Sequence, residues 1–202
     1  MQRLGILLSG RGSNFLSIHR AISEHRLLGA KIAVVLSNRE DAAGLHAARE
    51  LKIPAFCIPS AGRPRAAHDA ELIARLHQHR VDLICLAGYM RVLTADFVRA
   101  FPDRILNIHP SLLPAFPGLD AQKQALEYGA KVAGCTVHFV DEAVDHGVII
   151  LQKAVPIKED DTAETLSARV LQQEHAAYPE AIARVLSGQY AISNRRYVRR
   201  EK

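Results

Sequence analysis

The chain has 202 residues, of which 49% are hydrophobic and 23% are charged. This composition is typical of a globular protein with one core, and it excludes disordered and fibrous classes. No apolar run approaches the ~20 residues that cross a bilayer, and a Gly-rich stretch after Leu8 interrupts what a signal peptide would need. We therefore expect a cytoplasmic protein with no membrane partner.

The net charge of +5, with a pI near 9.3, raises the question of nucleic-acid binding. The last eight residues, Arg195 to Lys202, carry five basic residues and one acidic residue, so residues 1 to 194 are nearly neutral. A basic RNA-binding module is an alternative, but it would combine Lys and Arg with aromatic side chains along one face, and the chain has no Trp. We therefore predict no nucleic-acid partner, and a basic, frayed tail at 191–202.

Apolar, β-branched runs alternate with segments of helical periodicity in the first half of the chain. The runs predict buried strands at Leu4 to Leu8, Ile32 to Leu36, Ala55 to Ile58, Leu83 to Ala87, and Ile105 to Ile108. Helical spacing predicts helices at Asn14 to Leu27, Ala66 to Arg80, and Thr94 to Ala100. This alternation favours an α/β, Rossmann-like fold with a mostly parallel sheet and flanking helices.

The pattern changes after Pro110. A Pro-rich loop leads into a helix expected at Leu119 to Tyr128, and two strands at Val132 to Val140 and Val148 to Val155 follow as an expected antiparallel pair. A long helical segment then covers Thr162 to Leu186, and Pro179 should kink or divide it. No linker or repeat interrupts the chain, so we predict a single domain at 1–190.

Cysteines and histidines give little signal of special chemistry. Cys57, Cys85 and Cys135 lie apart in apolar surroundings, which favours reduced core residues over disulfides or a catalytic thiol. The ten histidines are scattered without metal-ligand spacing, so we predict no metal. His138 lies in an alternating strand and is expected to be packed or hydrogen-bonded in the sheet.

A Gly-rich turn follows the first predicted strand, with the sequence Ser9-Gly10-Arg11-Gly12-Ser13-Asn14. Ligands of open α/β sheets bind outside the carboxyl ends of the strands, and a helix N-terminus offers amide donors to an anion, so this turn is a candidate phosphate site. It is not a dinucleotide fingerprint, because Phe15 stands where the third glycine belongs. A tight turn with a Ser or Asn cap is the alternative.

A second candidate site lies at the end of the fifth predicted strand. Asn107 and His109 are two residues apart, so their side chains share one face of the strand. An Asn amide can stabilise a developing oxyanion, and a His titrates near neutrality. The orienting carboxylate could be Asp141, Glu142 or Asp145, and the spacing does not choose among them.

Taken together, these residues resemble the folate-dependent formyltransferase superfamily, and within it the phosphoribosylglycinamide (glycinamide ribonucleotide) formyltransferases. The motifs that carry the resemblance are Gly12-Ser13-Asn14, Ala87-Gly88-Tyr89-Met90-Arg91, Asn107-Ile108-His109-Pro110-Ser111-Leu112-Leu113-Pro114, Pro117-Gly118, and His138-Phe139-Val140 followed by Asp145 and Gly147. The resemblance runs from the first strand to about Tyr190.

The resemblance implies transfer of a formyl group from 10-formyltetrahydrofolate, as cosubstrate, to the amine of glycinamide ribonucleotide in purine biosynthesis, with no metal. It implies a catalytic set of Asn107, His109 and Asp145. It implies that the ribonucleotide is bound by Gly12, Ser13, Asn14, Phe15, Leu16 and Glu174. It implies folate contacts from Arg65, Met90, Arg91, Val92, Leu93, Asn107, Asp141, Glu142, Ala143, Val144 and Asp145.

The alternative within the superfamily is a formyltetrahydrofolate deformylase, in which water replaces the amine as acceptor. That enzyme typically carries a regulatory domain before this one, and here the first strand is expected to begin near Arg3. A transfer-RNA formyltransferase would carry a further C-terminal domain, which we do not expect after Tyr190. A homodimer is compatible with the sequence, which does not settle the oligomeric state. Truncating the basic tail is expected to leave substrate affinity almost unchanged.

Overall fold

The computed structural model describes residues 1–200, and the chain divides into two compact units, Met1–Asn107 and Ile108–Lys202. This division does not test whether residues 1–190 form a single domain followed by a tail at 191–202, so that arrangement stays a prediction. Glu201 and Lys202, the end of that tail, lie outside the described residues.

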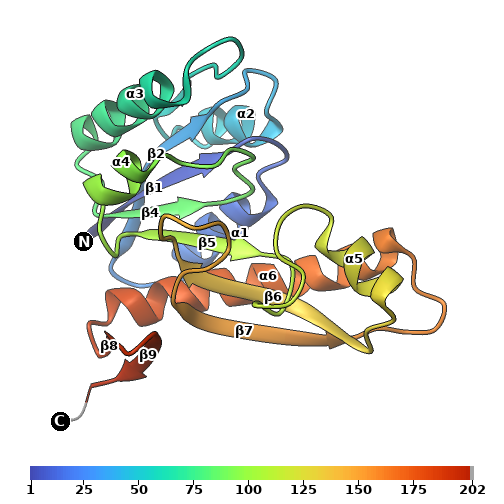
Figure 1. The fold of residues 1–202 in the computed structure, drawn as a ribbon. Helices are drawn as coiled ribbons and strands as arrows, with labels where there is room; N and C mark the ends of the chain where they lie inside the picture. The colour runs from blue at the N-terminus through green and yellow to red at the C-terminus, as the bar shows by residue number, and fades with distance from the viewer. Residues whose placement is uncertain (201–202) are drawn as a thin grey trace. The chain divides into compact units, whose positions relative to one another are not determined.

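The first unit is built on parallel strands in the order β3-β2-β1-β4-β5 (Figure 1). The strands are β1 (Gln2–Leu8), β2 (Ala30–Ser37), β3 (Ala55–Cys57), β4 (Leu83–Leu86) and β5 (Ile105–His109), the last two residues of which belong to the second unit. The helices are α1 (Ser13–Ser23), α2 (Ala43–Glu50), α3 (Arg65–Gln78) and α4 (Ala95–Ala100).

Close packing between α3 and the strands explains a glycine in the middle of β1. A Cβ on Gly5 would come within 2.7 Å of Leu76 Cδ2 and 2.9 Å of Val81 Cγ1. Leu76 is itself fully buried. The apolar strand runs of the sequence thus form a core beneath helices, as parallel sheets require.

The second unit contains an antiparallel pair, β6 (Val132–Phe139) and β7 (Ile149–Pro156), against which the long helix α6 (Ala163–Leu186) packs (Figure 1). It also holds α5 (Ala121–Tyr128). The buried face of α6 includes Leu166, Val170 and Tyr178. The α/β fold with a mostly parallel sheet and a late antiparallel pair is therefore confirmed.

Two expectations about the second unit need correction. Helix α6 is not divided at Pro179, which lies inside a continuous helix whose N-terminus is capped by the Thr162 and Thr165 side chains; a kink there stays a prediction. The chain after Tyr190 is not frayed over its described part, because β8 (Tyr190–Ser193) and β9 (Arg196–Arg199) pair as an antiparallel hairpin. Tyr190 and Tyr197 stack with ring centroids 5.3 Å apart, and this cross-strand contact stabilises the hairpin. The prediction of a frayed tail considered only the basic residues and not this aromatic pair.

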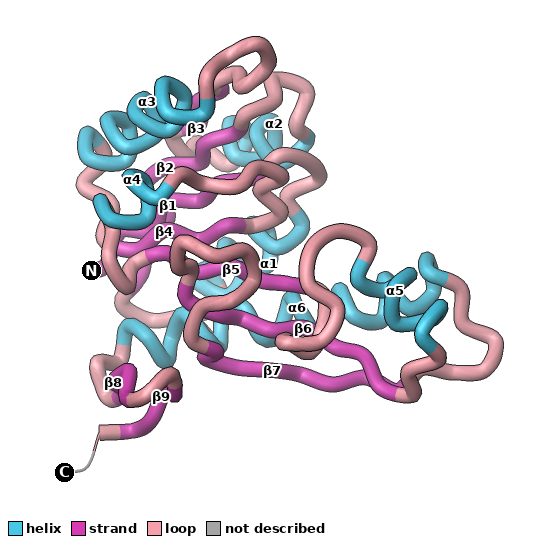
Figure 2. Tube along the Cα trace, viewed as in Figure 1, coloured by secondary structure: helices cyan, strands magenta, loops and turns pink. Residues whose placement is uncertain are grey.

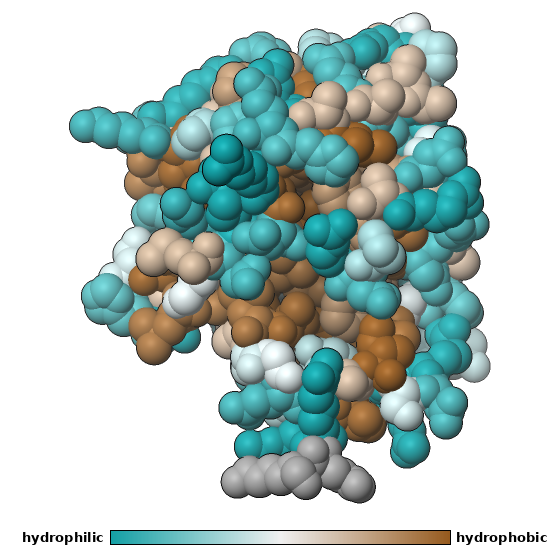
Figure 3. Space-filling model, turned by 90° about the vertical axis from the view of Figure 1, so that its left-hand side faces the viewer, coloured by the Kyte–Doolittle hydropathy of each residue, from teal (hydrophilic) through white to brown (hydrophobic). Residues whose placement is uncertain are grey.

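Long loops leave the strands of both units (Figure 2). Hydrophobic side chains reach the surface between hydrophilic ones on the face in Figure 3. Across the chain, exposed apolar side chains in such loops include Met90, Val92, Leu119 and Val144. No helix within residues 1–200 combines the length and the apolar character needed to span a bilayer.

Candidate active site

His109 ends β5 and is buried between two hydrogen-bond acceptors of the second unit. Its Nε2 lies 2.9 Å from the carbonyl oxygen of Phe116, and its Nδ1 lies 3.4 Å from Asp145 Oδ2. A neutral imidazole can donate at only one nitrogen, whereas an imidazolium donates at both. Both ring nitrogens of His109 therefore face oxygen acceptors.

Asp145 lies in the loop after β6, with its side chain 10% exposed. Its Oδ2 accepts the backbone N–H of Gly118 at 2.8 Å, so the carboxylate is held while it faces His109. Of the three acidic residues that the sequence left open, Asp145 is the one placed at ion-pair distance from this ring. Asp141 instead accepts the backbone N–H of Ala143 at 3.0 Å and lies 2.8 Å from His146 Nδ1.

A glycine allows the loop to turn back against the end of β6. A Cβ on Gly147 would collide with the carbonyl group of Phe139. Asp145 itself adopts a positive φ of 51°, which is uncommon for a residue with a side chain. The loop therefore holds Asp145 in a strained conformation of the kind that clusters at functional sites.

His138, on β6, is a buried neighbour of Asp145. Its Nδ1 lies 2.7 Å from the carbonyl oxygen of Phe139, and its Nε2 lies 3.9 Å from Asp145 Oδ1. Burial lowers the pKa of His138, more than the Phe139 carbonyl and Asp145 raise it, so the ring is neutral near pH 7. The prediction of a packed, hydrogen-bonded sheet residue is confirmed, but its nearness to Asp145 was missed.

The Pro-rich loop after His109 is fixed by a buried hydroxyl of β6. Thr136 Oγ1 donates to the carbonyl of Ser111 at 2.7 Å and accepts the N–H of Leu113 at 3.0 Å. Gln152 of β7 donates to Thr136 Oγ1 and to the carbonyl of Leu113, both at 2.9 Å. These contacts position the segment that carries the Phe116 carbonyl and the Gly118 N–H. The sequence did not predict a role for either group, because nearly every residue has a backbone N–H and C=O and residue type does not show which of them contact the site.

The Gly-rich turn of the first unit has the shape expected of an anion site. Gly12 takes a φ of +74° before α1, and a Cβ there would come within 2.6 Å of Gly44 Cα. The N-terminus of α1 has neither a side-chain cap nor an acidic residue in its first turn. The capped turn that stood as the alternative is therefore not what forms here.

The residues implied for folate lie at several places. In the first unit, Met90 and Val92 are 64% and 48% exposed, Arg65 begins α3, and Asn107 is half-buried on β5. Arg91 donates from Nη1 to the carbonyl of Ser60 at 3.3 Å, while its buried Nε has no partner among residues 1–200. In the second unit, the loop of Asp141 to Asp145 follows β6. Glu174, which the resemblance implies for the ribonucleotide, is buried on α6.

The second unit thus brings His109, Asp145 and His138 together. The first unit brings the Gly-rich turn close to the loop that begins at Gly88, through the hydrogen bond from Ser9 N–H to the Gly88 carbonyl at 3.0 Å.

All three cysteines are free, and burial raises the pKa of the thiols of Cys57 and Cys135 to about 11 and about 12. Reactive thiols need the opposite shift, so these groups are poor nucleophiles. No cluster of three potential metal ligands occurs in the described part of the chain, and the absence of a metal stays a prediction.

Comparison with known proteins identifies the family. The formyl transferase family matches residues 2–182. The chain is 43% identical over 187 residues to the phosphoribosylglycinamide formyltransferase of Bacillus subtilis, and the match covers 92% of this chain and 95% of that protein. It is 48% identical over 194 residues to a trifunctional purine biosynthetic protein, adenosine-3, of Drosophila melanogaster, where the match covers 95% of this chain but 14% of that protein.

A solved structure gives the same result. The crystal structure of glycinamide ribonucleotide transformylase 1 from Symbiobacterium toebii is 52% identical, with a TM-score of 0.96 over 100% of this chain and 95% of that chain. The chain therefore belongs to the formyl transferase family, and within it to the phosphoribosylglycinamide formyltransferases.

Proposed function

We propose that this protein transfers the formyl group of 10-formyltetrahydrofolate to the amine of glycinamide ribonucleotide. The observation that carries the proposal, beside the family, is the buried His109 flanked by the Asp145 carboxylate and the Phe116 carbonyl. An imidazolium held in this way is a hydrogen-bond donor suited to a carbonyl oxygen that gains negative charge.

The proposed chemistry begins with attack of the amine nitrogen on the formyl carbon. The C–N bond forms while the electron pair of the C=O bond moves to the formyl oxygen, which the Asn107 amide and the His109 imidazolium stabilise. Because Asp145 holds Nδ1 of His109, Nε2 is the nitrogen that would donate to the formyl oxygen. The formyl oxygen would then replace the Phe116 carbonyl as the acceptor at Nε2.

Collapse of the intermediate breaks the bond from the formyl carbon to the folate nitrogen. The attacking amine loses a proton and the departing nitrogen gains one, so the two transfers balance. Asp145, held by Gly118 N–H, is the group proposed to carry this proton, directly or through water. The products are formylglycinamide ribonucleotide and tetrahydrofolate.

The proposed binding groups are those expected from the sequence. The turn at Gly12 to Leu16 would hold the phosphate with backbone amides of α1, and the Glu174 carboxylate would accept from the ribose hydroxyls. The folate ring would lie against Met90 to Leu93, with Arg65, Asn107 and the Asp141 to Asp145 loop as further contacts. The buried Nε of Arg91 is a donor that a folate oxygen could use.

Competition between acceptors tests the proposed function. The purified protein is given 10-formyltetrahydrofolate with and without glycinamide ribonucleotide, and both formylated ribonucleotide and free formate are measured. We expect formylated ribonucleotide to form only when glycinamide ribonucleotide is present, with one molecule formed for each 10-formyltetrahydrofolate consumed. Free formate should stay at the uncatalysed level. Formate release at the same rate without the ribonucleotide would instead identify a deformylase.

A further inference from the structure

Ser9, a residue not included in the proposed site, links two turns of the first unit. It follows β1 and directly precedes the Gly-rich turn, and it is 6% exposed. Its backbone N–H donates to the Gly88 carbonyl at 3.0 Å, and its Oγ accepts the backbone N–H of Met90 at 2.8 Å. One buried residue thus holds both ends of a three-residue stretch of the loop proposed for folate.

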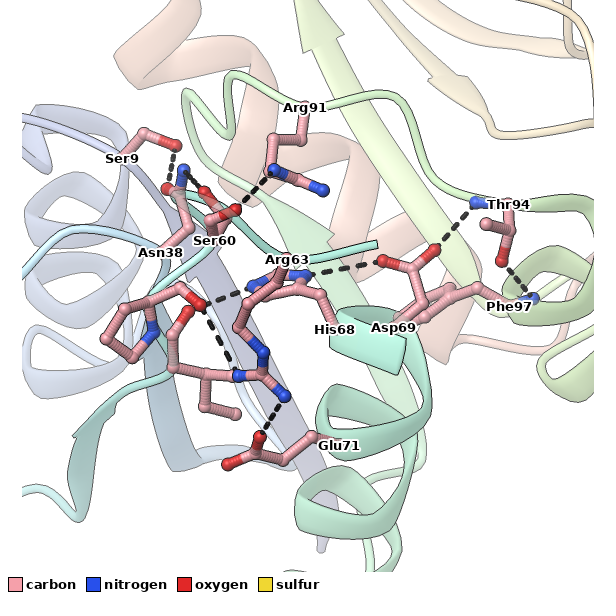
Figure 4. Close-up of polar contacts among 12 residues, drawn as sticks. Ser9, Asn38, Ser60, Arg63, His68, Asp69, Glu71, Arg91, Thr94 and Phe97 are labelled. Atoms are coloured by element: carbon pink, nitrogen blue, oxygen red, sulfur yellow. Dashed lines mark hydrogen bonds and ion pairs between the residues drawn. The ribbon is translucent and has the colours of Figure 1, made fainter. Parts of the chain in front are cut away.

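The hydroxyl hydrogen of Ser9 has a defined acceptor as well. Ser9 Oγ donates to Asn38 Oδ1 at 2.6 Å, and Asn38 Nδ2 donates to Ser60 Oγ at 3.1 Å. Arg91 Nη1 donates to the carbonyl of Ser60 at 3.3 Å. Because Arg91 is bonded to Met90 along the chain, these contacts close a ring of hydrogen bonds. Figure 4 shows its contacts between Ser9 and Asn38, Asn38 and Ser60, and Arg91 and Ser60.

The ring joins the carboxyl ends of four strands in their spatial order. Ser60 follows β3, Asn38 follows β2, Ser9 follows β1, and Arg91 follows β4, and the sheet order is β3-β2-β1-β4. The bonds of Ser60 to Asn38, Asn38 to Ser9, and Ser9 to Met90 each span neighbouring loops, while the bond from Arg91 to Ser60 joins the two outer loops of the four. These four hydrogen bonds are partly buried, and groups joined in one such network are coupled energetically.

The turn itself is tied to the rest of the unit right after Ser9. Gly10 accepts the N–H of Gly44 through its carbonyl at 3.0 Å, and Gly12 packs against Gly44 with no room for a Cβ. The turn cannot move without moving Ser9, since only Gly10 and Arg11 separate Ser9 from Gly12.

We propose that Ser9 is a positioning residue that couples the ribonucleotide and folate sites, through its bonds to Gly88 and Met90 on one side and the Gly-rich turn on the other. The inference rests on the proposed function, because it assigns the two turns to those two ligands. When phosphate fixes the turn, Ser9 holds the Met90 loop in the folate-binding position. Bound ribonucleotide therefore lowers the Kd of folate by a certain factor, and by linkage bound folate lowers the Kd of the ribonucleotide by the same factor.

The test measures that factor with ligands that do not react together. Tetrahydrofolate, which lacks the formyl group, is titrated by calorimetry with and without saturating glycinamide ribonucleotide, and the ratio of the two Kd values is the coupling factor. We expect a factor of about 5 or more in the natural protein, the lower end of typical couplings, and a factor near 1 in Ser9→Ala. The reverse titration must give the same factor.

Ser23→Ala is the matched control. It removes a serine hydroxyl of α1 that donates to the carbonyl of His19 at 3.0 Å, away from the ring. We expect its coupling factor to equal that of the natural protein. If Ser9→Ala does not fold, Asn38→Ala breaks the next bond of the ring and is expected to lower the factor.

Two results would overturn the inference. One is a coupling factor of 1 in the natural protein, and the other is an unchanged factor in Ser9→Ala or, where that variant does not fold, in Asn38→Ala. Either result leaves the proposed function standing if the natural protein still transfers the formyl group, whereas absence of transfer from natural protein would count against the proposed function.

Discussion

At the scale of single residues, two buried histidines beside the same carboxylate differ in the contacts of their ring nitrogens. His138 and His109 are both buried, and both lie near Asp145. Burial lowers the pKa of His138 and keeps its ring neutral, although the Phe139 carbonyl and Asp145 act in the opposite direction. His109 instead faces an oxygen acceptor at each ring nitrogen, the Phe116 carbonyl at Nε2 and the Asp145 carboxylate at Nδ1.

The charge of Asp145 should therefore matter more than its shape. Asp145→Asn keeps an oxygen that accepts the Gly118 N–H but removes the negative charge beside His109. We expect kcat to fall by roughly 10²- to 10⁴-fold, the scale of general acid–base assistance, with a much smaller change in the KM of the folate. Steady-state formyl transfer measures both.

Glu127→Gln supplies the control for that variant. Glu127 is an exposed carboxylate on α5 that pairs with Lys123 at 3.8 Å, so the variant removes the same charge from the same unit. Its kcat should match that of the natural protein. Equal rates for the Asn and Asp forms at position 145 would remove this carboxylate from the mechanism.

At the scale of elements, the C-terminal hairpin contacts the loop that carries Asp145. Arg195 donates from Nη2 to the carbonyl of His146 at 2.7 Å, and its Nη1 lies 3.1 Å from His146 Nε2. Asn194 and Arg195 both take positive φ values, of 46° and 62°, in a two-residue turn. Asn-Gly is the preferred sequence for such a turn, so the arginine is conformationally unfavourable there.

This contact predicts that Arg195→Gly improves the turn while loosening the loop. The variant gives Asn-Gly at the hairpin but deletes the guanidinium. A hydrogen bond at the surface contributes about 0.5–1.5 kcal/mol, so amide hydrogens at 141–147 should exchange roughly 2- to 10-fold faster. Those of β8 and β9 should be protected at least as well as before. Hydrogen–deuterium exchange resolves the two segments.

Arg196→Ala, which removes a charge next to the same turn, should leave the loop unchanged. Unchanged exchange at 141–147 in Arg195→Gly would mean that the hairpin does not hold the loop. The expectation that the tail has almost no effect on substrate affinity stays untested, and this contact argues against it.

The strands were easier to predict than the parts that join them. Buried parallel strands read as continuous apolar runs, and all five in the first unit were found within three residues of their ends. Helix α2 was missed because Ala43–Glu50 contains a single large apolar residue, Leu45. The hairpin was missed because residues 195–202 were interpreted as a basic, frayed tail, while its aromatic contacts are between Tyr190, Tyr197 and Phe139.

The candidate site divides in the same way. His109 and the Gly-rich turn could be predicted because strand ends and glycines are local signals. The choice of Asp145 over Asp141, the Phe116 carbonyl and the Ser9 ring depend on contacts between residues far apart in the chain. Spacing along a single sequence does not carry that information.

At the scale of the whole molecule, a buried neutral histidine makes stability depend on pH. The pKa of His138 is lowered from about 6.5 in the folded protein by burial, whereas the unfolded chain restores the ordinary value. Below about pH 6.5 the unfolded state therefore binds more protons than the folded state, and the free energy of unfolding falls as the pH falls. The loss continues until the pH reaches the lowered pKa of the folded state.

We expect this loss to be smaller in His138→Gln. For one proton the slope is at most about 1.4 kcal/mol per pH unit, and the variant should lose that part of the slope between pH 6.5 and 5. Some slope should remain, because burial also lowers the pKa of His79. Urea unfolding at several pH values gives the slopes, so a lower stability of the variant at neutral pH does not confuse the comparison. Identical slopes in the two proteins would show that His138 takes up its proton as readily in the folded as in the unfolded chain.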